Sequence, residues 1–243
     1  MKYLIGNLKM NLTCLESMEY IKKLQNAIAA KKYQNVKFGA AFSHDAISLS
    51  YTNLDRNFLF GAQNIFHEEK GAYTGEISIR SAIELGLDFI LIGHSERRKL
   101  FNETDELINA KIKKIEKTKI FPILCVGENQ EEFENNKMEE VLTRQIQSAL
   151  KDIDILGRLI ISYEPVYCIG NGIIPKHEHV QHAVDLIRKL TNNKVPVLYG
   201  GSVCDKNIDT LLEVKNVDGF LVGGAALDPE KFVEMGEHLE RKK

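Results

Sequence analysis

The chain has 243 residues, of which 44% are hydrophobic and 27% are charged, and its 32 basic and 34 acidic side chains give a net charge of −2. This composition is typical of a folded globular protein and excludes intrinsic disorder as the main state. The charge excludes a strongly basic nucleic-acid-binding protein, although a lysine and a few backbone amides can still bind a phosphate locally. The longest apolar runs are too short to cross a bilayer, and no signal-peptide core follows the first residues, so we expect a cytoplasmic protein.

Eight short apolar runs with the character of β-strands recur along the chain. Several are apolar at consecutive positions, as in Phe89–Ile92. A strand that is apolar on both faces indicates a parallel sheet covered by helices. The expected strands comprise residues 3–8, 36–42, 58–62, 88–92, 120–126, 158–163, 195–199 and 219–222.

The segments between these runs carry apolar residues at the spacing of amphipathic helices. Asp228 followed by Pro229 predicts the start of a last helix, which runs to about Glu240. Three apolar stripes precede it: Leu15, Met18, Ile21, Leu24 and Ile28; Met138, Val141, Leu142, Ile146, Ala149 and Leu150; and Val180, Ala183, Val184, Ile187 and Leu190.

Eight strand–helix units of roughly 30 residues, with no linker between them, predict one (β/α)8 barrel domain over residues 1–243. A doubly wound open sheet is the alternative, but no GxGxxG motif follows the first run. The cysteines at positions 14, 125, 168 and 204 form no CxxC pair. We therefore expect reduced thiols rather than a disulfide framework or a zinc site.

In a barrel of this kind, the chemistry lies at the carboxyl ends of the strands. Here those ends carry one cation, Lys9, one imidazole, His94, and one carboxylate, Glu164. The glycine-rich turns at residues 200–202 and 223–224 let backbone amides approach an anion closely. A lone base, an imidazole and a cation around a phosphate site favour proton abstraction next to the carbonyl of a small phosphorylated substrate.

The same strand ends carry a series of motifs that resembles triosephosphate isomerases. The matching segments follow the order of that family from residue 3 to residue 235, which makes the resemblance specific. They are residues 6–11, 61–64, 71–76, 93–98, 125–128, 163–166, 169–170, 199–202 and 221–225.

The resemblance implies a TIM barrel isomerase that interconverts dihydroxyacetone phosphate and D-glyceraldehyde 3-phosphate through an enediolate, in glycolysis and gluconeogenesis, without cofactor or metal. Glu164 is expected to move the proton between the first and second carbons. A neutral His94 is expected to donate to the substrate oxygens, Lys9 to stabilise their negative charge, and Asn7 to donate to one of them. These roles are the established ones of the family and come with the resemblance.

The resemblance also assigns the phosphate site. The backbone amides of Gly170, Ser202, Gly223 and Gly224 are expected to hold the phosphate, and Glu96 to support the site from outside the substrate shell. A lid over the cavity is expected to protect the enediolate from water. The lid comprises Pro165, Val166, Tyr167, Cys168, Ile169, Gly170, Asn171 and Gly172.

The resemblance further implies a homodimer. The loop from Gln63 to Glu76 is expected to insert into the partner near its Lys9, with Thr74 at the tip of the loop. Cys125 occupies a position typical of the family, and we expect its role to be structural.

The sequence departs from the family pattern mainly in the lid. Leu8 stands where the family usually has Trp, and Tyr167, Cys168, Asn171 and Ile173 also differ from the usual residues. None of them is a proton-transfer group. We expect Tyr167 to pack in the closed lid as the usual Trp does, and Cys168 to be exposed and oxidisable without a catalytic role.

Two other functions were weighed against the isomerase. A Schiff-base aldolase on the same barrel needs a lysine on the sixth strand, and residues 158–163 contain none. A phosphate-binding scaffold without activity is disfavoured because the cation, the imidazole and the carboxylate are all present.

The only histidine-rich segment gives little support to a metal site. His177, His179 and His182 lie two and three positions apart at the start of a helix. This spacing does not form a closed ligand set with an acid, so we expect no metal there.

Overall fold

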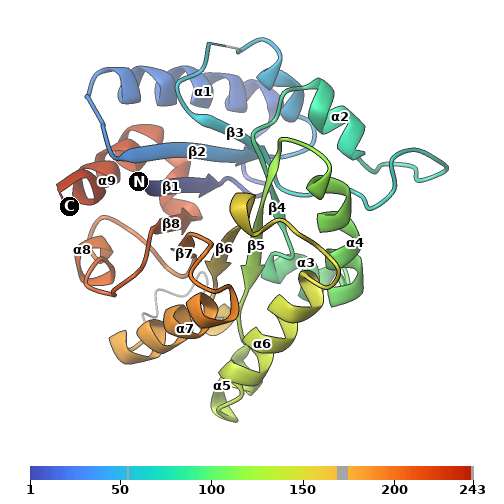
Figure 1. Cartoon of the computed structure of the whole chain (residues 1–243). Coiled ribbons are helices and arrows are strands. Elements are labelled where there is room, and N and C mark those ends of the chain that lie inside the picture. Colours follow the sequence, from blue (N-terminus) through green and yellow to red (C-terminus); the bar gives the residue numbers. More distant parts are fainter. Residues whose placement is uncertain (54, 169–174, 242–243) are drawn as a thin grey trace.

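Eight parallel strands close into a barrel, each paired with the next along the chain and the last paired with the first (Figure 1). The computed structural model describes residues 1–53, 55–168 and 175–241. The strands are β1 (Lys2–Asn7), β2 (Val36–Phe42), β3 (Leu59–Ala62), β4 (Phe89–Ile92), β5 (Phe121–Val126), β6 (Ile160–Tyr163), β7 (Val197–Tyr199) and β8 (Gly219–Val222). Tyr3 of β1 lies in register with Gly219 of β8. This closure confirms the barrel, and the doubly wound open sheet is wrong.

Helices surround the barrel on its outer side (Figure 1). They are α1 (Cys14–Ala29), α2 (Ile79–Glu84), α3 (Ser95–Leu100), α4 (Asp105–Glu116), α5 (Gln130–Glu134), α6 (Met138–Ala149), α7 (His177–Leu190), α8 (Ile208–Leu211) and α9 (Pro229–Arg241). The described residues also contain four short 3₁₀ helices: η1 (Ile47–Ser50), η2 (Leu156–Arg158), η3 (Val166–Cys168) and η4 (Gly224–Leu227). The expected start of the last helix is confirmed, because Asp228 Oδ1 accepts from the amide of Lys231 at 3.2 Å.

Five strands begin later than the apolar pattern predicts: β3, β4 and β5 by one residue, and β6 and β7 by two. The two larger differences have a local cause. Arg158, expected in the sixth strand, ends η2, and its guanidinium donates to the carbonyls of Thr118 and Ile120. Val195 and Pro196 precede β7, because proline has no amide N–H to donate to a neighbouring strand. In both places a local hydrogen-bonding requirement shortens a strand that hydrophobicity alone would extend.

The apolar stripe expected on α1 is only partly correct. Leu15 is 72% exposed and Met18 is 38% exposed, whereas Ile21, Leu24 and Ile28 are buried. Each three-residue step along a helix turns the stripe by roughly 60°, so two such steps carry Leu15 away from the core-facing side. The expected stripes of α6 and α7 are confirmed, apart from their last leucines, which are only partly buried.

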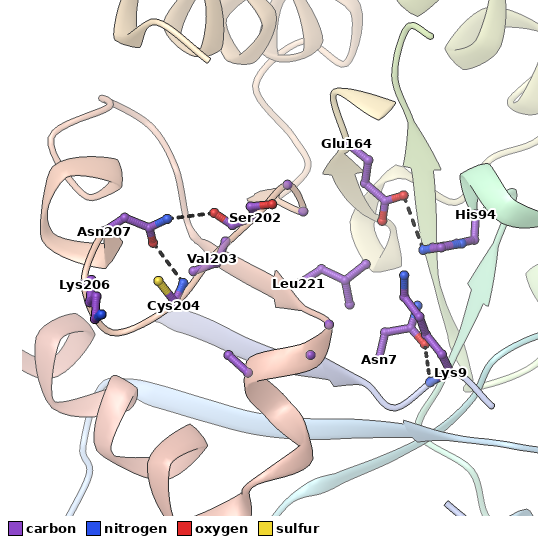
Figure 2. Close-up of a pocket in the computed structure, with 15 residues that line it drawn as sticks. Asn7, Lys9, His94, Glu164, Ser202, Val203, Cys204, Lys206, Asn207 and Leu221 are labelled. Atoms are coloured by element: carbon purple, nitrogen blue, oxygen red, sulfur yellow. Dashed lines mark hydrogen bonds and ion pairs between the residues drawn. The ribbon is translucent and has the colours of Figure 1, made fainter. Parts of the chain in front are cut away.

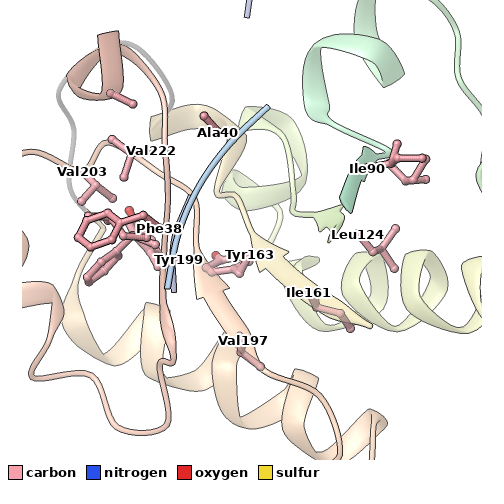
Figure 3. Packing of buried hydrophobic residues seen from close by; sticks show 14 of the residues in the cluster. Phe38, Ala40, Ile90, Leu124, Ile161, Tyr163, Val197, Tyr199, Val203 and Val222 are labelled. Atoms are coloured by element: carbon pink, nitrogen blue, oxygen red, sulfur yellow. The ribbon is translucent and has the colours of Figure 1, made fainter. Parts of the chain in front are cut away.

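The core forms two layers, one inside the barrel and one between the barrel and its helices. Along β4, Phe89 and Leu91 belong to the inner layer, and Ile90 and Ile92 belong to the outer layer. Figure 3 shows part of the outer layer. The consecutive apolar residues of the sequence therefore mark a strand that is buried on both faces, as expected.

One glycine is needed for this packing. A Cβ atom at Gly61 of β3 would lie 2.3 Å from the ring of Phe89 on the neighbouring strand. The large inner side chain of β4 therefore depends on the absence of a side chain opposite it.

Among the described residues, no helix is both long and apolar enough to cross a membrane.

Candidate active site

A cavity of about 520 Å³ opens at the carboxyl ends of the strands (Figure 2). Of the predicted site residues, the structure brings together seven along its wall: Asn7, Lys9, His94, Glu164, Ser202, Gly223 and Gly224. Glu96 lies beside Lys9 and does not line the cavity. Ile169, Gly170, Asn171 and Gly172 lie outside the described residues, as does Ile173.

Glu164 and His94 face each other at one end of the cavity. Glu164 Oε2 lies 3.6 Å from His94 Nε2, and the carboxylate is only 2% exposed. Its amide donates to the carbonyl of Val126 at 2.7 Å, which anchors the residue to the end of β5. Within the described residues Oε2 makes no hydrogen bond, so this oxygen is available to accept a proton.

The imidazole of His94 is oriented by the helix that follows it. His94 is the N-cap residue of α3, and its Nδ1 accepts from the amide of Glu96 at 3.3 Å. An accepting Nδ1 carries no proton, so the neutral ring carries its proton on Nε2. The N–H of the imidazole therefore points toward Glu164 and the cavity.

A neutral thiol lies next to the carboxylate. Burial raises the pKa of the Cys125 thiol well above its ordinary value, and the negative charge of Glu164 raises it further. Cys125 is 1% exposed and belongs to the layer inside the barrel. It thus adds no charge next to Glu164.

Lys9 adopts a backbone conformation that is unfavourable for a lysine. Its φ of 52° lies in the left-handed region, and three contacts hold it there. Its amide donates to Asn7 Oδ1 at 3.1 Å, and its carbonyl accepts from Gln63 Nε2 at 2.8 Å. Its ammonium lies 2.6 Å from Glu96 Oε1, which directs the charge along the cavity wall.

Two glycines with open backbone, Gly223 and Gly224, also line the cavity. A Cβ atom at Gly224 would meet nothing within 4 Å, and one at Gly223 would meet only Lys9 Cε, at 3.7 Å. Asn207 holds the neighbouring loop, because its Oδ1 accepts from the Cys204 amide and its Nδ2 donates to the Ser202 carbonyl, both at 2.9 Å. Open glycine backbone beside a fixed loop is suited to bind an anion through amides.

Gly200, unlike Gly223 and Gly224, has no open space next to its Cα atom. A Cβ atom at Gly200 would lie 2.5 Å from Ser162 Oγ and 2.7 Å from Glu164 Cγ. The side chain of Glu164 therefore occupies the space that a larger residue at position 200 would need.

The described part of the lid packs against an aromatic side chain outside the cavity. Tyr167 stacks on Phe133 with ring centroids 4.0 Å apart. Burial raises the pKa of the Tyr167 hydroxyl, and so do the charges of Cys168 and Glu128. The expectation that Cys168 is exposed is wrong, because its side chain is fully buried and its carbonyl accepts from Ser202 Oγ at 2.6 Å.

Sequence reasoning missed several residues that support the site. Gln63 was assigned only to the dimer loop, although it directly follows β3 and also donates to the Ala41 carbonyl at 3.1 Å. Inspecting the end of the third strand as closely as the others would have found it. Asn207 and Lys206, which line the cavity from the loop after β7, carry no local signal. In residues 1–53, 55–168 and 175–241, no cluster of three or more His, Cys, Asp or Glu side chains could hold a metal ion.

Three comparisons with known proteins agree with one another. The family model described as "Triosephosphate isomerase" matches residues 2–239. The chain is 38% identical over 237 residues to the triosephosphate isomerase of Mycoplasma mobile, covering 96% of this chain and 98% of the relative. It is 42% identical over 249 residues to that of Mycoplasmoides gallisepticum, covering 97% of each chain. The crystal structure of triosephosphate isomerase from Bartonella henselae superposes with a TM-score of 0.89 at 30% identity and 99% coverage of both chains.

Proposed function

Because the chain belongs to the triosephosphate isomerase family, and is an isomerase that interconverts dihydroxyacetone phosphate and D-glyceraldehyde 3-phosphate in glycolysis, we propose that Glu164 and His94 carry out its proton transfer. The observation that supports this most directly is the 3.6 Å separation of Glu164 Oε2 and His94 Nε2 on one side of the cavity. One group is oriented to accept a proton and the other to donate a hydrogen bond.

The proposed reaction moves one proton between two neighbouring carbons and one between their two oxygens. Glu164 Oε2 takes the proton from the carbon next to the carbonyl, and the electron pair of that C–H bond forms the double bond of an enediolate. His94 Nε2–H donates to the oxygens as their charge develops, and the ammonium of Lys9 stabilises that charge. His94 gives its Nε2 proton to the oxygen that was the carbonyl and takes the proton of the neighbouring hydroxyl, so that one proton moves between the two oxygens. Glu164 then returns a proton to the neighbouring carbon as the second oxygen becomes the carbonyl, which gives the other triose phosphate.

We propose that the phosphate binds at the opposite end of the cavity, to the amides of Ser202, Gly223 and Gly224. The open backbone at the two glycines supports this placement. Gly170 is assigned to the same site by resemblance only, as are the lid residues from 169 to 172. Asn7 is 5% exposed, lines the cavity and is proposed to donate to a substrate oxygen.

We further propose a cytoplasmic homodimer formed through the loop from Gln63 to Glu76. Several large apolar side chains are exposed in or near this loop and in the segments after Lys9 and His94: Met10, Leu15, Tyr73, Ile83, Leu100 and Phe101. Large apolar side chains left exposed in these segments favour a protein–protein contact there. Sedimentation at working concentration should give twice the mass of the chain, and a monomer would contradict the proposal.

The direct test of the catalytic assignment is the variant Glu164→Gln, which keeps the shape of the side chain and removes its basicity. In a coupled assay with glyceraldehyde 3-phosphate, turnover should fall by the ~10²–10⁴-fold typical of general acid–base groups, with a smaller change in substrate binding. Near-normal turnover would contradict the role of Glu164. An assay with a chelator should leave wild-type activity unchanged.

The same preparation discriminates the two rival functions. An aldolase-type Schiff base would be trapped by borohydride as an adduct between substrate and enzyme, and β6 carries no lysine to form one. Tight binding of a triose phosphate without turnover would support an inactive binding protein.

A further inference from the structure

A buried carboxylate lies behind the active site, outside the cavity. Glu128 follows β5 and its side chain is fully buried. Its Oε1 accepts from the hydroxyl of Tyr163 at 2.9 Å and lies 2.8 Å from His179 Nε2. Together with the stacked rings of Phe133 and Tyr167, these residues form what we call the Glu128 cluster: Glu128, Phe133, Tyr163, Tyr167 and His179.

His179 is the basic residue next to this carboxylate, with its Nε2 2.8 Å from Glu128 Oε1. A carboxylate removed from water needs a positive partner or several hydrogen bonds. The tyrosines that face it from β6, η3 and β7 are neutral, because burial and the charge of Glu128 raise the pKa values of Tyr163, Tyr167 and Tyr199. In the part of the chain that the structure describes, His179 is the one basic residue within ion-pair distance of Glu128.

The Glu128 cluster holds the chain on both sides of the base. Tyr163 directly precedes Glu164, and the amide of Val166 donates to the Glu128 carbonyl at 3.0 Å. A Cβ atom at Gly127 would lie 1.8 Å from the carbonyl oxygen of Glu164, so the backbones of the two segments are in close contact. A shift of Glu128 must therefore be transmitted to Glu164.

His179 also contacts the aromatic part of the cluster. Its ring lies edge-on to Phe133 at 5.2 Å, and Phe133 stacks on Tyr167. From the sequence alone, His179 is one of three histidines whose spacing does not suit a metal site. Its neighbour on α7, His182, is 55% exposed and pairs with Glu139, which is 64% exposed, at the surface.

We propose that His179 is a positioning residue for the isomerisation. By donating from Nε2 to the buried carboxylate of Glu128, it fixes residues 163–167 and so keeps the carboxylate of Glu164 directed toward His94. The proposal rests on the proposed role of Glu164 as the base. It does not involve contact between His179 and the substrate.

The test compares His179→Leu with His179→Gln, whose amide can still donate to Glu128, and with the matched control His182→Leu on the same helix. Since a misplacement of about 1 Å can cost ~100-fold in rate, we expect His179→Leu to lower kcat by ~10- to ~100-fold. KM should change less than kcat, because Ser202, Gly223 and Gly224, whose amides are proposed to bind phosphate, lie outside residues 163–167. His179→Gln should recover most of the kcat, and His182→Leu should behave as wild type.

Loss of fold is controlled by a variant that removes the buried charge as well. Glu128→Gln should lower kcat, and adding His179→Leu to it should lower kcat little further, because the two residues act through one contact. The proposal is overturned if His179→Leu has the kcat of wild type, if His179→Gln is as impaired as His179→Leu, or if the two substitutions are additive. A Glu164→Gln variant assayed in parallel separates the role of Glu164 as the base from the role of His179 in positioning it. Full activity of Glu164→Gln refutes the role of Glu164. Loss of activity in Glu164→Gln with full activity in His179→Leu refutes only the positioning role of His179.

Discussion

The two ends of the active-site cavity are built in different ways. At the proton-transfer end, His94 and Glu164 are each held by specific contacts from neighbouring strand ends and loops. Lys9 lies between the two ends, since a Cβ atom at Gly223 would lie 3.7 Å from its Cε. At the opposite end, Gly223 and Gly224 present open backbone, and the neighbouring loop is fixed from behind. Chemistry at the first end depends on the direction of individual side chains, whereas binding at the second depends on amides that many sequences could supply. Substitutions at the first end should therefore affect kcat, and substitutions at the second end should affect KM.

After the loss expected for Glu164→Gln, the next largest effect is expected for Lys9→Met, which keeps most of the length of the side chain and removes its charge. Charge that develops on the enediolate would lose its nearest ammonium, so kcat/KM should fall by ~10²–10³-fold, as when one electrostatic stabiliser is removed. Steady-state kinetics on the purified variant measures this. Activity close to wild type would mean that Lys9 does not face the developing charge.

A smaller effect distinguishes two glycines at neighbouring strand ends. In Gly200→Ala, the new Cβ would collide with the side chains of Ser162 and Glu164, so kcat should fall by up to ~100-fold through displacement of the base. In Gly224→Ala, the new Cβ meets open space, so kcat should stay near wild type and any change should appear in KM. An equal loss of kcat in both variants would contradict the proposal that the two ends of the cavity have different roles.

The smallest effect concerns the thiol of Cys168. Burial raises its pKa to about 11, from an ordinary value of 9.0, so the reactive thiolate is scarce at pH 8. Iodoacetamide at pH 8 should modify the partly exposed Cys14 and Cys204 before Cys168. Peptide mapping after a short exposure checks this order, and early labelling of Cys168 would show that the segment after Pro165 is open.

The same shift makes the stability of the fold depend on pH in a defined direction. The folded protein holds the Cys168 proton more tightly than the unfolded chain does, so its contribution to stability is complete below about pH 9 and is lost as the pH rises toward 11. Thermal unfolding of wild type and Cys168→Ala between pH 8 and pH 11 should differ in slope accordingly.

Much of this architecture was predictable, because the strands of a barrel and the residues that follow them can be recognised in short stretches of sequence. Runs such as Phe89–Ile92 are apolar on both faces only if both faces are buried, and the structure confirms this. The exposure of Leu15 and the burial of Cys168 were not predictable, since they depend on helix rotation and on contacts with distant segments. The place of Gln63 after the third strand was visible in the sequence, but its hydrogen bonds to the distant carbonyls of Lys9 and Ala41 depend on the fold. Asn207 makes local hydrogen bonds to residues 202 and 204, for which the sequence carries no motif. That Glu164 and His94 face each other was expected, because each follows a strand end. That Nδ1 of His94 accepts a hydrogen bond could be seen only from the geometry at the start of α3.

The claim that Glu164 moves a proton between two carbons is tested most directly by isomerisation in D₂O. The proton that Glu164 removes can exchange with solvent before it is returned, so product from the wild-type enzyme should carry deuterium on the carbon that becomes protonated. Nuclear magnetic resonance of the product measures this incorporation. Complete retention of the substrate hydrogen, as in a direct hydride shift between the carbons, would contradict the account.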